Sequence, residues 1–243
     1  CVATRLLFTM GINIQKLYGA ILTAMGEAPL QGGASGNANT GRGFSRRGII
    51  MGKIKVTETN LTDVKIIEPA VFGDHRGFFT ESYSVEDFKA AGIDFDFIQD
   101  NHSLSTQPGV LRGLHFQKGQ SAQTKLIRVV TGAVLDVIVD IRKGSPTYGK
   151  WEGYILSEHN HRQLLVPRGF AHGFVTLTPN VNFLYKCDNY YDAEADGGIS
   201  FADPDLAIDW PIDIDKAITS EKDAKQPTLK EFEAENPFVY GEI

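Results

Sequence analysis

The sequence has few cysteines, no long apolar run and no surplus of positive charge, and each lack excludes a class of protein. Two cysteines in 243 residues are too few for a disulfide framework, which favours a reducing compartment. No apolar run reaches the roughly 20 residues of a membrane helix. The formal net charge is -6, whereas nucleic-acid binding needs a basic surface. We therefore expect a cytoplasmic protein that binds neither membranes nor nucleic acids.

The first 50 residues differ in composition from the rest of the chain. They hold five Lys or Arg residues and one acidic residue, so residues 51–243 hold 19 basic and 29 acidic residues. Residues 31–48 have the composition of a flexible linker. We interpret residues 1–50 as a disordered or artefactual extension, and residues 51–243 as one domain that begins at Met51. A transit peptide is the alternative, because residues 1–50 are basic.

From residue 53 onward, short runs of alternating apolar and polar residues recur, a pattern typical of β-strands. The predicted strands are Lys53–Thr59, Val64–Ile67, Gly77–Tyr83, Phe95–His102, Gly109–Phe116, Lys125–Thr131, Ala133–Ile141, Lys150–Leu156, Arg162–Val166, Gly173–Thr176 and Asn182–Tyr191. Only Val85–Ala91 and Leu229–Glu235 are expected to be short helices. Strands at this spacing, without intervening helices, indicate an all-β antiparallel sandwich or barrel.

Residues 111–117, Leu-Arg-Gly-Leu-His-Phe-Gln, carry the most informative histidine of the chain. On a strand, His115 and Gln117 would share one face and Leu114 and Phe116 the other, because successive side chains alternate. Imidazole suits proton transfer near neutral pH, but a single histidine on a strand is more often structural. These residues by themselves leave proton transfer, metal binding and a structural role open.

Polar side chains recur on several of the other predicted strands. Buried polar groups cost free energy unless they are paired, and a barrel built for stability alone would turn apolar side chains inward. Yet Arg, His, Lys, Asn, Gln or Tyr residues gather in 99–103, 125–128, 166–174 and 183–186. This accumulation indicates a binding site for a polar ligand.

The β pattern also suits a cupin barrel, so a metal site has to be considered. Metal-binding cupins usually carry a His-x-His pair followed by a Glu, whereas here His115 is followed by Phe116-Gln117-Lys118. His172, in a second cupin-like motif, would bring the nitrogen ligands to two, but a catalytic metal site normally has three protein ligands. We therefore predict no metal. A metal-dependent cupin enzyme is the alternative.

Seven motifs follow one another along residues 51–243: Phe72-Gly73-Asp74-x-Arg76-Gly77-Phe78-Phe79, Gln99-Asp100-Asn101-His102-Ser103, Leu111-Arg112-Gly113-Leu114-His115-Phe116-Gln117, Val166-Pro167-x-Gly169-Phe170-Ala171-His172-Gly173-Phe174, Phe183-Leu184-Tyr185-Lys186, Asp203-Pro204-Asp205-Leu206-x-Ile208-x-Trp210-Pro211 and Ser220-x-Lys222-Asp223. Through these motifs, residues 51–243 resemble the dTDP-4-dehydrorhamnose 3,5-epimerases, a family of metal-free cupins, and residues 1–50 have no counterpart there. This resemblance covers nearly the whole of residues 51–243. It implies an all-β, cupin-type antiparallel β-barrel (jelly roll) with a few short helices.

The resemblance also implies an activity. The expected enzyme is an isomerase without a cofactor, which carries out 3,5-epimerisation of dTDP-4-dehydro-6-deoxy-D-glucose to dTDP-4-dehydro-L-rhamnose in dTDP-L-rhamnose biosynthesis. The alternative within this resemblance is an enzyme that inverts only C3 or only C5 of a related dTDP-4-keto deoxysugar. The sequence separates these two poorly.

The resemblance further implies a role for each matching residue. His115 would be the general base, Asp223 would orient it, Tyr185 would return the proton from the opposite face, and Lys125 would stabilise the enolate. The substrate-binding residues would be Arg76 and Arg112 at the diphosphate, Glu81, Gln99, Asn101 and His172 at the nucleotide and sugar, and Tyr191 and Phe79. The family forms homodimers with exchanged N-terminal strands, so Arg76 and Glu81 would serve the partner's pocket.

Overall fold

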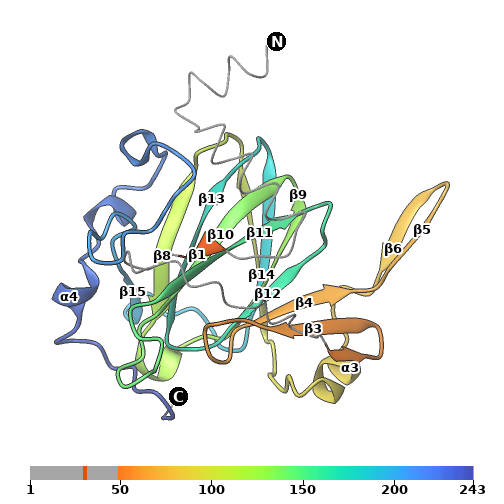
Figure 1. Ribbon diagram of the computed structural model, residues 1–243, viewed down its shortest axis with the longest axis horizontal. Helices are drawn as coiled ribbons and strands as arrows, with labels where there is room; N and C mark the ends of the chain where they lie inside the picture. Colours follow the sequence, from red (N-terminus) through yellow and green to blue (C-terminus); the bar gives the residue numbers. More distant parts are fainter. Residues whose placement is uncertain (1–29, 32–48, 243) are drawn as a thin grey trace, which may run out of the picture.

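The computed structural model describes residues 30–31 and 49–242, and most of these fold into two antiparallel β-sheets (Figure 1). The first sheet has the order β1 (Leu30–Gln31), β11 (Trp151–Ser157), β10 (Ala133–Asp140), β13 (Phe170–Thr176), β8 (Leu111–Gln117), β15 (Asp196–Gly198). The second has the order β2 (Ile49–Met51), β3 (Ile54–Glu58), β4 (Lys65–Pro69), β12 (Gln163–Val166), β9 (Lys125–Thr131), β14 (Val181–Cys187), β7 (Gln99–Ser105).

The two sheets face each other across a common apolar core, and β10 shows how the chain fills it. Val134 and Ile138 of β10 belong to the core between the sheets, whereas Leu135 and Val137 belong to a second core on the outer side of the first sheet. Successive side chains point to opposite faces, so a strand covered on both faces is apolar along most of its length. This two-sheet arrangement confirms the prediction of an all-β antiparallel barrel.

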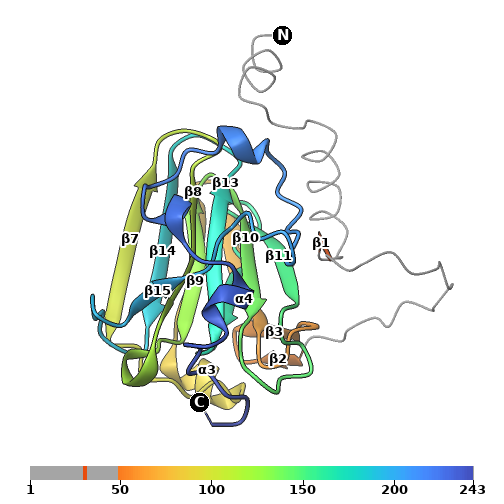
Figure 2. The same cartoon turned by 90° about the vertical axis from the view of Figure 1, so that its left-hand side faces the viewer.

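The C-terminal segment, residues 199–238, covers the outer face of the first sheet (Figure 2). The Trp151 indole N–H donates to the Leu206 carbonyl at 2.9 Å. The Phe116 ring lies 4.9 Å from that of Phe232 and 5.6 Å from that of Phe238, measured between centroids. The segment contains the short helices η2 (Ile214–Lys216), η3 (Asp223–Lys225) and α4 (Leu229–Phe232). Apolar packing therefore holds in place the part of the chain that carries Asp223.

Several predicted elements agree with the structure. Strand β9 has the predicted bounds, and the helices predicted at Val85 and Leu229 appear as α3 (Val85–Ala90) and α4. A further short helix, η1, spans Gly119–Ser121. None of the described helices is long and apolar enough to cross a membrane.

Two predicted strand ends are wrong by four residues, and three others, the ends of Gly77–Tyr83 and Phe95–His102 and the start of Gly173–Thr176, are wrong by three. Residues 95–98 precede β7 rather than belonging to it, because Phe95 and Phe97 pack with Tyr83 beside α3. Residues 188–191 lie beyond the end of β14 at Cys187. The predicted extension at residues 1–50 lies mostly outside the described residues and stays a prediction. Strand β2 crosses its proposed boundary and pairs with β3.

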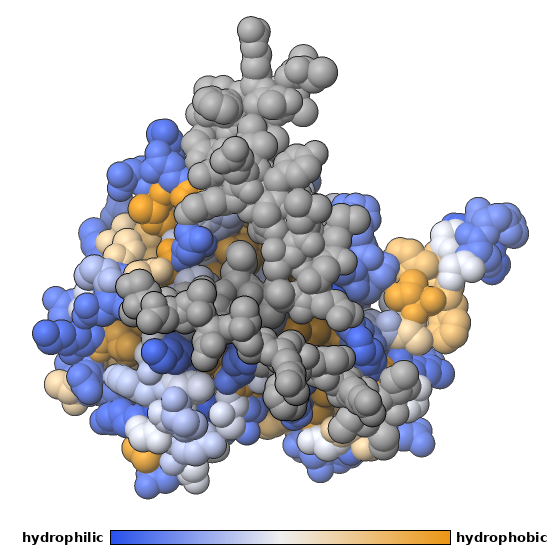
Figure 3. Space-filling model, in the orientation of Figure 1, coloured by the Kyte–Doolittle hydropathy of each residue, from blue (hydrophilic) through white to orange (hydrophobic). Residues whose placement is uncertain are grey.

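A two-stranded hairpin, β5 (Val71–Asp74) with β6 (Gly77–Thr80), projects from the barrel (Figure 1). Phe72, Phe78 and Phe79 are 54%, 62% and 63% exposed. Figure 3 shows apolar surface on the part of the hairpin nearer the barrel and hydrophilic surface at its tip. Clustered exposed apolar side chains of this kind mark a surface that another molecule covers.

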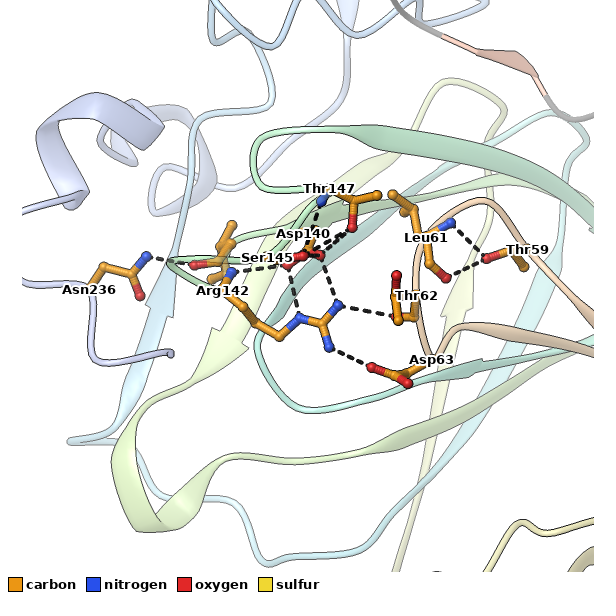
Figure 4. Close-up of polar contacts among 10 residues, drawn as sticks. Thr59, Leu61, Thr62, Asp63, Asp140, Arg142, Ser145, Thr147 and Asn236 are labelled. Atoms are coloured by element: carbon orange, nitrogen blue, oxygen red, sulfur yellow. Dashed lines mark hydrogen bonds and ion pairs between the residues drawn. The ribbon is translucent and has the colours of Figure 1, made fainter. Parts of the chain in front are cut away.

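A buried polar network around Arg142 joins the two sheets (Figure 4). Its guanidinium donates to Asp140 at 3.0 and 2.8 Å, to Asp63 at 2.9 Å and to the Thr62 carbonyl at 3.1 Å. Asp140 ends β10 of the first sheet, and Asp63 precedes β4 of the second. Burial alone would raise the pKa of Asp140, but hydrogen bonds from Arg142 and from two hydroxyl groups hold it below its ordinary value.

We expect Arg142→Ala to lower the free energy of unfolding strongly. The Arg142 and Asp140 side chains are 5% and 0% exposed, and removing one partner of a buried ion pair typically costs about 3–5 kcal/mol. Lys216→Ala is the control, because it removes an exposed ion pair with Asp213, and solvent-exposed ion pairs contribute little to stability. Denaturant unfolding measures both, and equal losses would contradict a stabilising role for the network.

Candidate active site

A cavity of about 590 Å³ lies within the barrel. Its walls come from β8 and β13 of the first sheet, from β9, β14 and the end of β7 in the second sheet, and from residues 218–223. Six predicted site residues line it: Arg112, His115, Lys125, His172, Tyr185 and Asp223. Residues that are far apart in the sequence therefore meet around one space.

Asp223 is the carboxylate partner of His115. The His115 Nε2–H donates to Asp223 Oδ1 at 2.7 Å, and the backbone N–H of Gly113 donates to Asp223 Oδ2 at 3.2 Å. The Asp223 side chain is 5% exposed and that of His115 33%, so the carboxylate is shielded while the imidazole reaches the cavity. Burial alone would raise the pKa of Asp223, but hydrogen bonds involving His115, Gly113 and Ser220 hold it below its ordinary value. Asp223 is therefore ionised near neutral pH and fixes the orientation of the ring.

Lys125 and Tyr185 line the same cavity from the second sheet. Lys125 begins β9, Tyr185 lies on the neighbouring strand β14, and the Lys125 Nζ is 5.9 Å from the centroid of the Tyr185 ring. Burial lowers the pKa of Lys125 and raises the pKa of Tyr185. The phenol is therefore protonated at neutral pH and can donate its proton, and the Lys125 amino group lies beside it.

His172 lies directly opposite His115 in the pairing of β8 with β13. Its Nε2 is hydrogen-bonded to Asp136 Oδ1 at 3.0 Å, and both side chains are buried. Burial raises the pKa of Asp136 and lowers the pKa of His172. The sequence analysis did not select Asp136. Its one signal was a carboxylate inside the apolar run Ala133–Ile141.

Gln99, Asn101 and Tyr191 extend the polar surface beyond the cavity. Asn101 is opposite Tyr185 in the pairing of β7 with β14, and the Gln99 side-chain carbonyl accepts from the backbone N–H of Tyr191 at 3.0 Å. The Tyr191 residue is 59% exposed. These three predicted binding residues form a continuous strip that begins beside Tyr185 and ends at the exposed aromatic ring.

Lys222 and Asp196 are two further polar residues of the site to which the sequence analysis gave no role. Lys222 lines the cavity next to Asp223 and forms an ion pair with Asp196, which also accepts from the Tyr191 hydroxyl at 3.4 Å. The motif Ser220-x-Lys222-Asp223 contained one of them, but only the folded chain brings Asp196 to it.

Arg76, Phe79 and Glu81, predicted to bind substrate, do not line the cavity of their own chain. Arg76 and Phe79 lie on the projecting hairpin and Glu81 follows it. Arg76 pairs with Asp74, and Glu81 accepts from Lys53 at 2.7 Å. The hairpin therefore separates these three residues from the other predicted site residues within one chain.

Both histidines of the cavity are hydrogen-bonded through Nε2 to an aspartic acid side chain, His115 to Asp223 and His172 to Asp136. In residues 30–31 and 49–242, no group of three or more His, Cys, Asp or Glu side chains is arranged to hold a metal ion. Among the described residues, the cavity thus contains two histidines, each paired with one aspartic acid side chain.

Comparison with known proteins places this fold and cavity in one group. Residues 58–231 match the family model of dTDP-4-dehydrorhamnose 3,5-epimerase. The Salmonella typhimurium dTDP-4-dehydrorhamnose 3,5-epimerase is 52% identical, over 72% of this chain and 94% of that protein. The crystal structure of the Bacillus anthracis enzyme, with TDP and PPi bound, is 55% identical with a TM-score of 0.70 and covers 72% of this chain and 99% of that one.

A Legionella pneumophila dTDP-6-deoxy-D-glucose-3,5-epimerase in complex with dTDP-4-keto-L-rhamnose is 47% identical, with a TM-score of 0.73 over 77% of this chain and 98% of that one. Fold and site together define a cupin-type β-barrel isomerase, which confirms the predicted fold class. The chain belongs to the dTDP-4-dehydrorhamnose 3,5-epimerase family.

The low pKa of Asp223 predicts how stability depends on pH. A carboxyl group whose pKa is lower in the folded state stabilises the fold above its ordinary pKa, and that stabilisation is lost as the pH falls toward the folded value. We expect Asp223→Asn to be less stable than the wild type at neutral pH, with a difference that shrinks below about pH 4. Urea unfolding at several pH values measures this. The exposed Asp205→Asn should show no such trend, and the same trend there would contradict the assignment to Asp223.

Proposed function

We propose that this protein catalyses the 3,5-epimerisation of dTDP-4-dehydro-6-deoxy-D-glucose to dTDP-4-dehydro-L-rhamnose, a step in dTDP-L-rhamnose biosynthesis in the cytoplasm. The observation that carries the proposal is the placement of proton-transfer groups around one cavity. His115, held by Asp223, comes from the first sheet, whereas Tyr185 and Lys125 come from the second. Such an arrangement suits removal of a proton from one face of a sugar and its return to the other.

His115 is the proposed base. The carbons C3 and C5 both adjoin the C4 ketone, so a proton on either becomes removable once the resulting enolate is stabilised. Because Asp223 accepts from Nε2–H, Nδ1 is the nitrogen left to take the proton. The neighbouring carboxylate favours the imidazolium that forms during transfer. A positioned base typically contributes about 10²–10⁴-fold to the rate.

Lys125 and Tyr185 complete the exchange. The Lys125 ammonium stabilises the enolate oxygen at C4, and loss of one such stabiliser typically costs roughly 3–4 kcal/mol in the barrier. Tyr185, protonated because burial raises its pKa, returns a proton from the opposite face and inverts the carbon. One proton leaves and one returns, so the reaction involves no net oxidation and needs no redox cofactor.

The remaining polar residues are proposed to bind the nucleotide and the sugar. Arg112 lies at the cavity with an exposed side chain, and guanidinium groups bind phosphate oxygens in two-point contacts. Gln99, Asn101 and Tyr191 would contact the nucleotide end, and His172 the sugar. This grouping accounts for a local anion site in a protein of net negative charge.

A homodimer with exchanged N-terminal strands would bring in the hairpin residues. Phe72, Phe78 and Phe79 are exposed on a hairpin that projects from its own barrel, and a second copy of the chain would cover them. In such a dimer Arg76 and Glu81 would enter the partner's cavity, where Arg76 would exchange its exposed pairing with Asp74 for the substrate diphosphate.

Proton exchange in deuterated water tests the proposed reaction. The 4-keto sugar nucleotide, incubated with the enzyme and followed by NMR, should take up deuterium at both C3 and C5. The similarity to a Streptomyces bikiniensis 3'-monoepimerase, 34% identical with a TM-score of 0.70, makes exchange at one carbon the informative alternative. Absence of exchange at either carbon would refute the proposal.

His115→Ala and Tyr185→Phe sharpen the same measurement. His115→Ala should abolish exchange while dTDP binding largely survives, because the base is lost and the nucleotide contacts remain. Tyr185→Phe should slow epimerisation more than proton loss, since it removes the acid rather than the base. Near-normal exchange by His115→Ala would exclude His115 as the base.

Mixing two inactive variants tests the exchanged hairpin. His115→Ala and Arg76→Ala should each be nearly inactive. If Arg76 serves the partner's cavity, one cavity of each mixed dimer regains both residues. Random mixing should then restore about a quarter of wild-type activity, because half of the dimers are mixed and one of two cavities is intact in each. Capture of an affinity-tagged Arg76→Ala chain, which must retain untagged His115→Ala chain from the mixture, is the control for subunit exchange. If the mixture passes this control and shows no recovery of activity, the proposed placement of Arg76 in the partner's cavity is contradicted.

A further inference from the structure

Arg112 and His115 both line the cavity although they are three residues apart on β8. In a regular strand, side chains three positions apart point to opposite faces. A strand that turned His115 inward would therefore turn Arg112 outward, away from the cavity. Something between the two residues changes the alternation.

The pairing of β8 with β13 locates the change. His172 is opposite His115 and Phe174 is opposite Arg112, so two steps along β13 correspond to three along β8. The register shift between His172 and Phe174 is a β-bulge, in which one extra residue of β8 lies between paired positions. Bulges re-aim side chains and bend the strand locally. This one places Arg112 and His115 on the same side.

Two glycines make the bulge possible. Gly113 has a φ of +125°, a conformation that residues with a side chain rarely adopt. A Cβ on Gly113 would lie 2.5 Å from the Gly173 Cα, and a Cβ on Gly173 would lie 2.6 Å from the Arg112 carbonyl oxygen. Neither position can hold a side chain unless the two backbones move apart.

The bulge also provides a backbone hydrogen-bond donor for the Asp223 carboxylate. The Gly113 N–H donates to Asp223 Oδ2 at 3.2 Å, while His115 donates to Oδ1 of the same group. The β8 backbone and the His115 ring thus fix the Asp223 carboxylate jointly, each through one of its two oxygens. A shift of the Gly113 backbone would therefore change both the orientation of the His115 side chain and the position of the Asp223 carboxylate.

We propose that Gly113 and Gly173 are positioning residues of the epimerase. Their backbone contact sets the bulge of β8, and the bulge brings Arg112, His115 and the Asp223 carboxylate into one arrangement. The inference rests on the proposed function for its catalytic meaning. Gly173 also lines the cavity, but the proposed effect of both glycines is on the position of the neighbouring side chains.

Gly173→Ala is the test, with Gly153→Ala as its matched control. Gly153 lies on β11 of the same sheet, with β10 between it and β13, and the atoms nearest to a Cβ there would belong to the Leu135 and Trp151 side chains, at 3.1 Å and beyond. We expect kcat for deuterium exchange to fall about 100-fold in Gly173→Ala, the effect of roughly 1 Å of misplacement, and to stay within about threefold of wild type in Gly153→Ala. The pH profile of kcat should change only in Gly173→Ala.

A measurement that does not need activity accompanies the kinetics. In the nitrogen-15 spectrum, the His115 Nε2–H signal should move in Gly173→Ala and stay in place in Gly153→Ala. If the wild type exchanges no deuterium, the proposed function fails while this signal still reports on positioning. A folded Gly173→Ala with wild-type kcat, pH profile and His115 signal overturns the inference.

A second route covers the case in which Gly173→Ala does not fold. The Gly113 amide proton donates to Asp223 in the wild type, so its chemical shift should change in Asp223→Ala, a variant that leaves both glycines intact. The Gly153 amide, on β11, should not change. An unchanged Gly113 amide signal in folded Asp223→Ala would overturn the link between the bulge and the carboxylate.

Discussion

The site depends on the burial of one apolar surface, the outer face of the first sheet. The C-terminal segment covers that face through contacts such as Phe116 with Phe232 and the hydrogen bond from Trp151 to the Leu206 carbonyl. Burial of large aromatic side chains is the main source of stability in such a layer. The same packing carries Asp223 to His115, 108 residues away along the chain. An apolar contact thus positions a polar one.

The apolar interior of this barrel also contains ionisable side chains, whose burial costs free energy. Asp136 and His172 are removed from water, and burial raises the pKa of Asp136 and lowers the pKa of His172, so that it favours the neutral form of each. The two groups persist in the interior because they pair with each other and because the surrounding strands are apolar on their other faces. As a consequence, His115 on β8 and His172 on β13 lie opposite each other, and each is paired with an aspartic acid side chain. The proposed chemistry uses one as a base and the other as a contact to the sugar.

How far the sequence could predict this structure varied with the kind of interaction. Strand β9 was predictable to the residue, because β-branched residues are concentrated in Lys125–Thr131 and Gly132 follows it directly. The residues 95–98 misled, because an aromatic cluster around Tyr83 and Phe97 has the composition of a strand but is held by tertiary packing beside α3. Asp136 was overlooked, since nothing in Ala133–Ile141 tells which carboxylate will meet a histidine on the next strand.

The sequence by itself determined the all-β class, the membership suggested by its ordered motifs, and the chemical groups available to the site, because these depend on residue type and local order. Only the tertiary structure decided which groups meet. In the folded chain, His115 pairs with Asp223, and Tyr185 of the other sheet lines the same cavity. Arg76 lies on a hairpin outside the cavity of its own chain. The tertiary structure also broke the strand alternation at Gly113. Alternation records which face a side chain takes in a regular strand, whereas a bulge arises from a contact with Gly173, 60 residues further along a different strand.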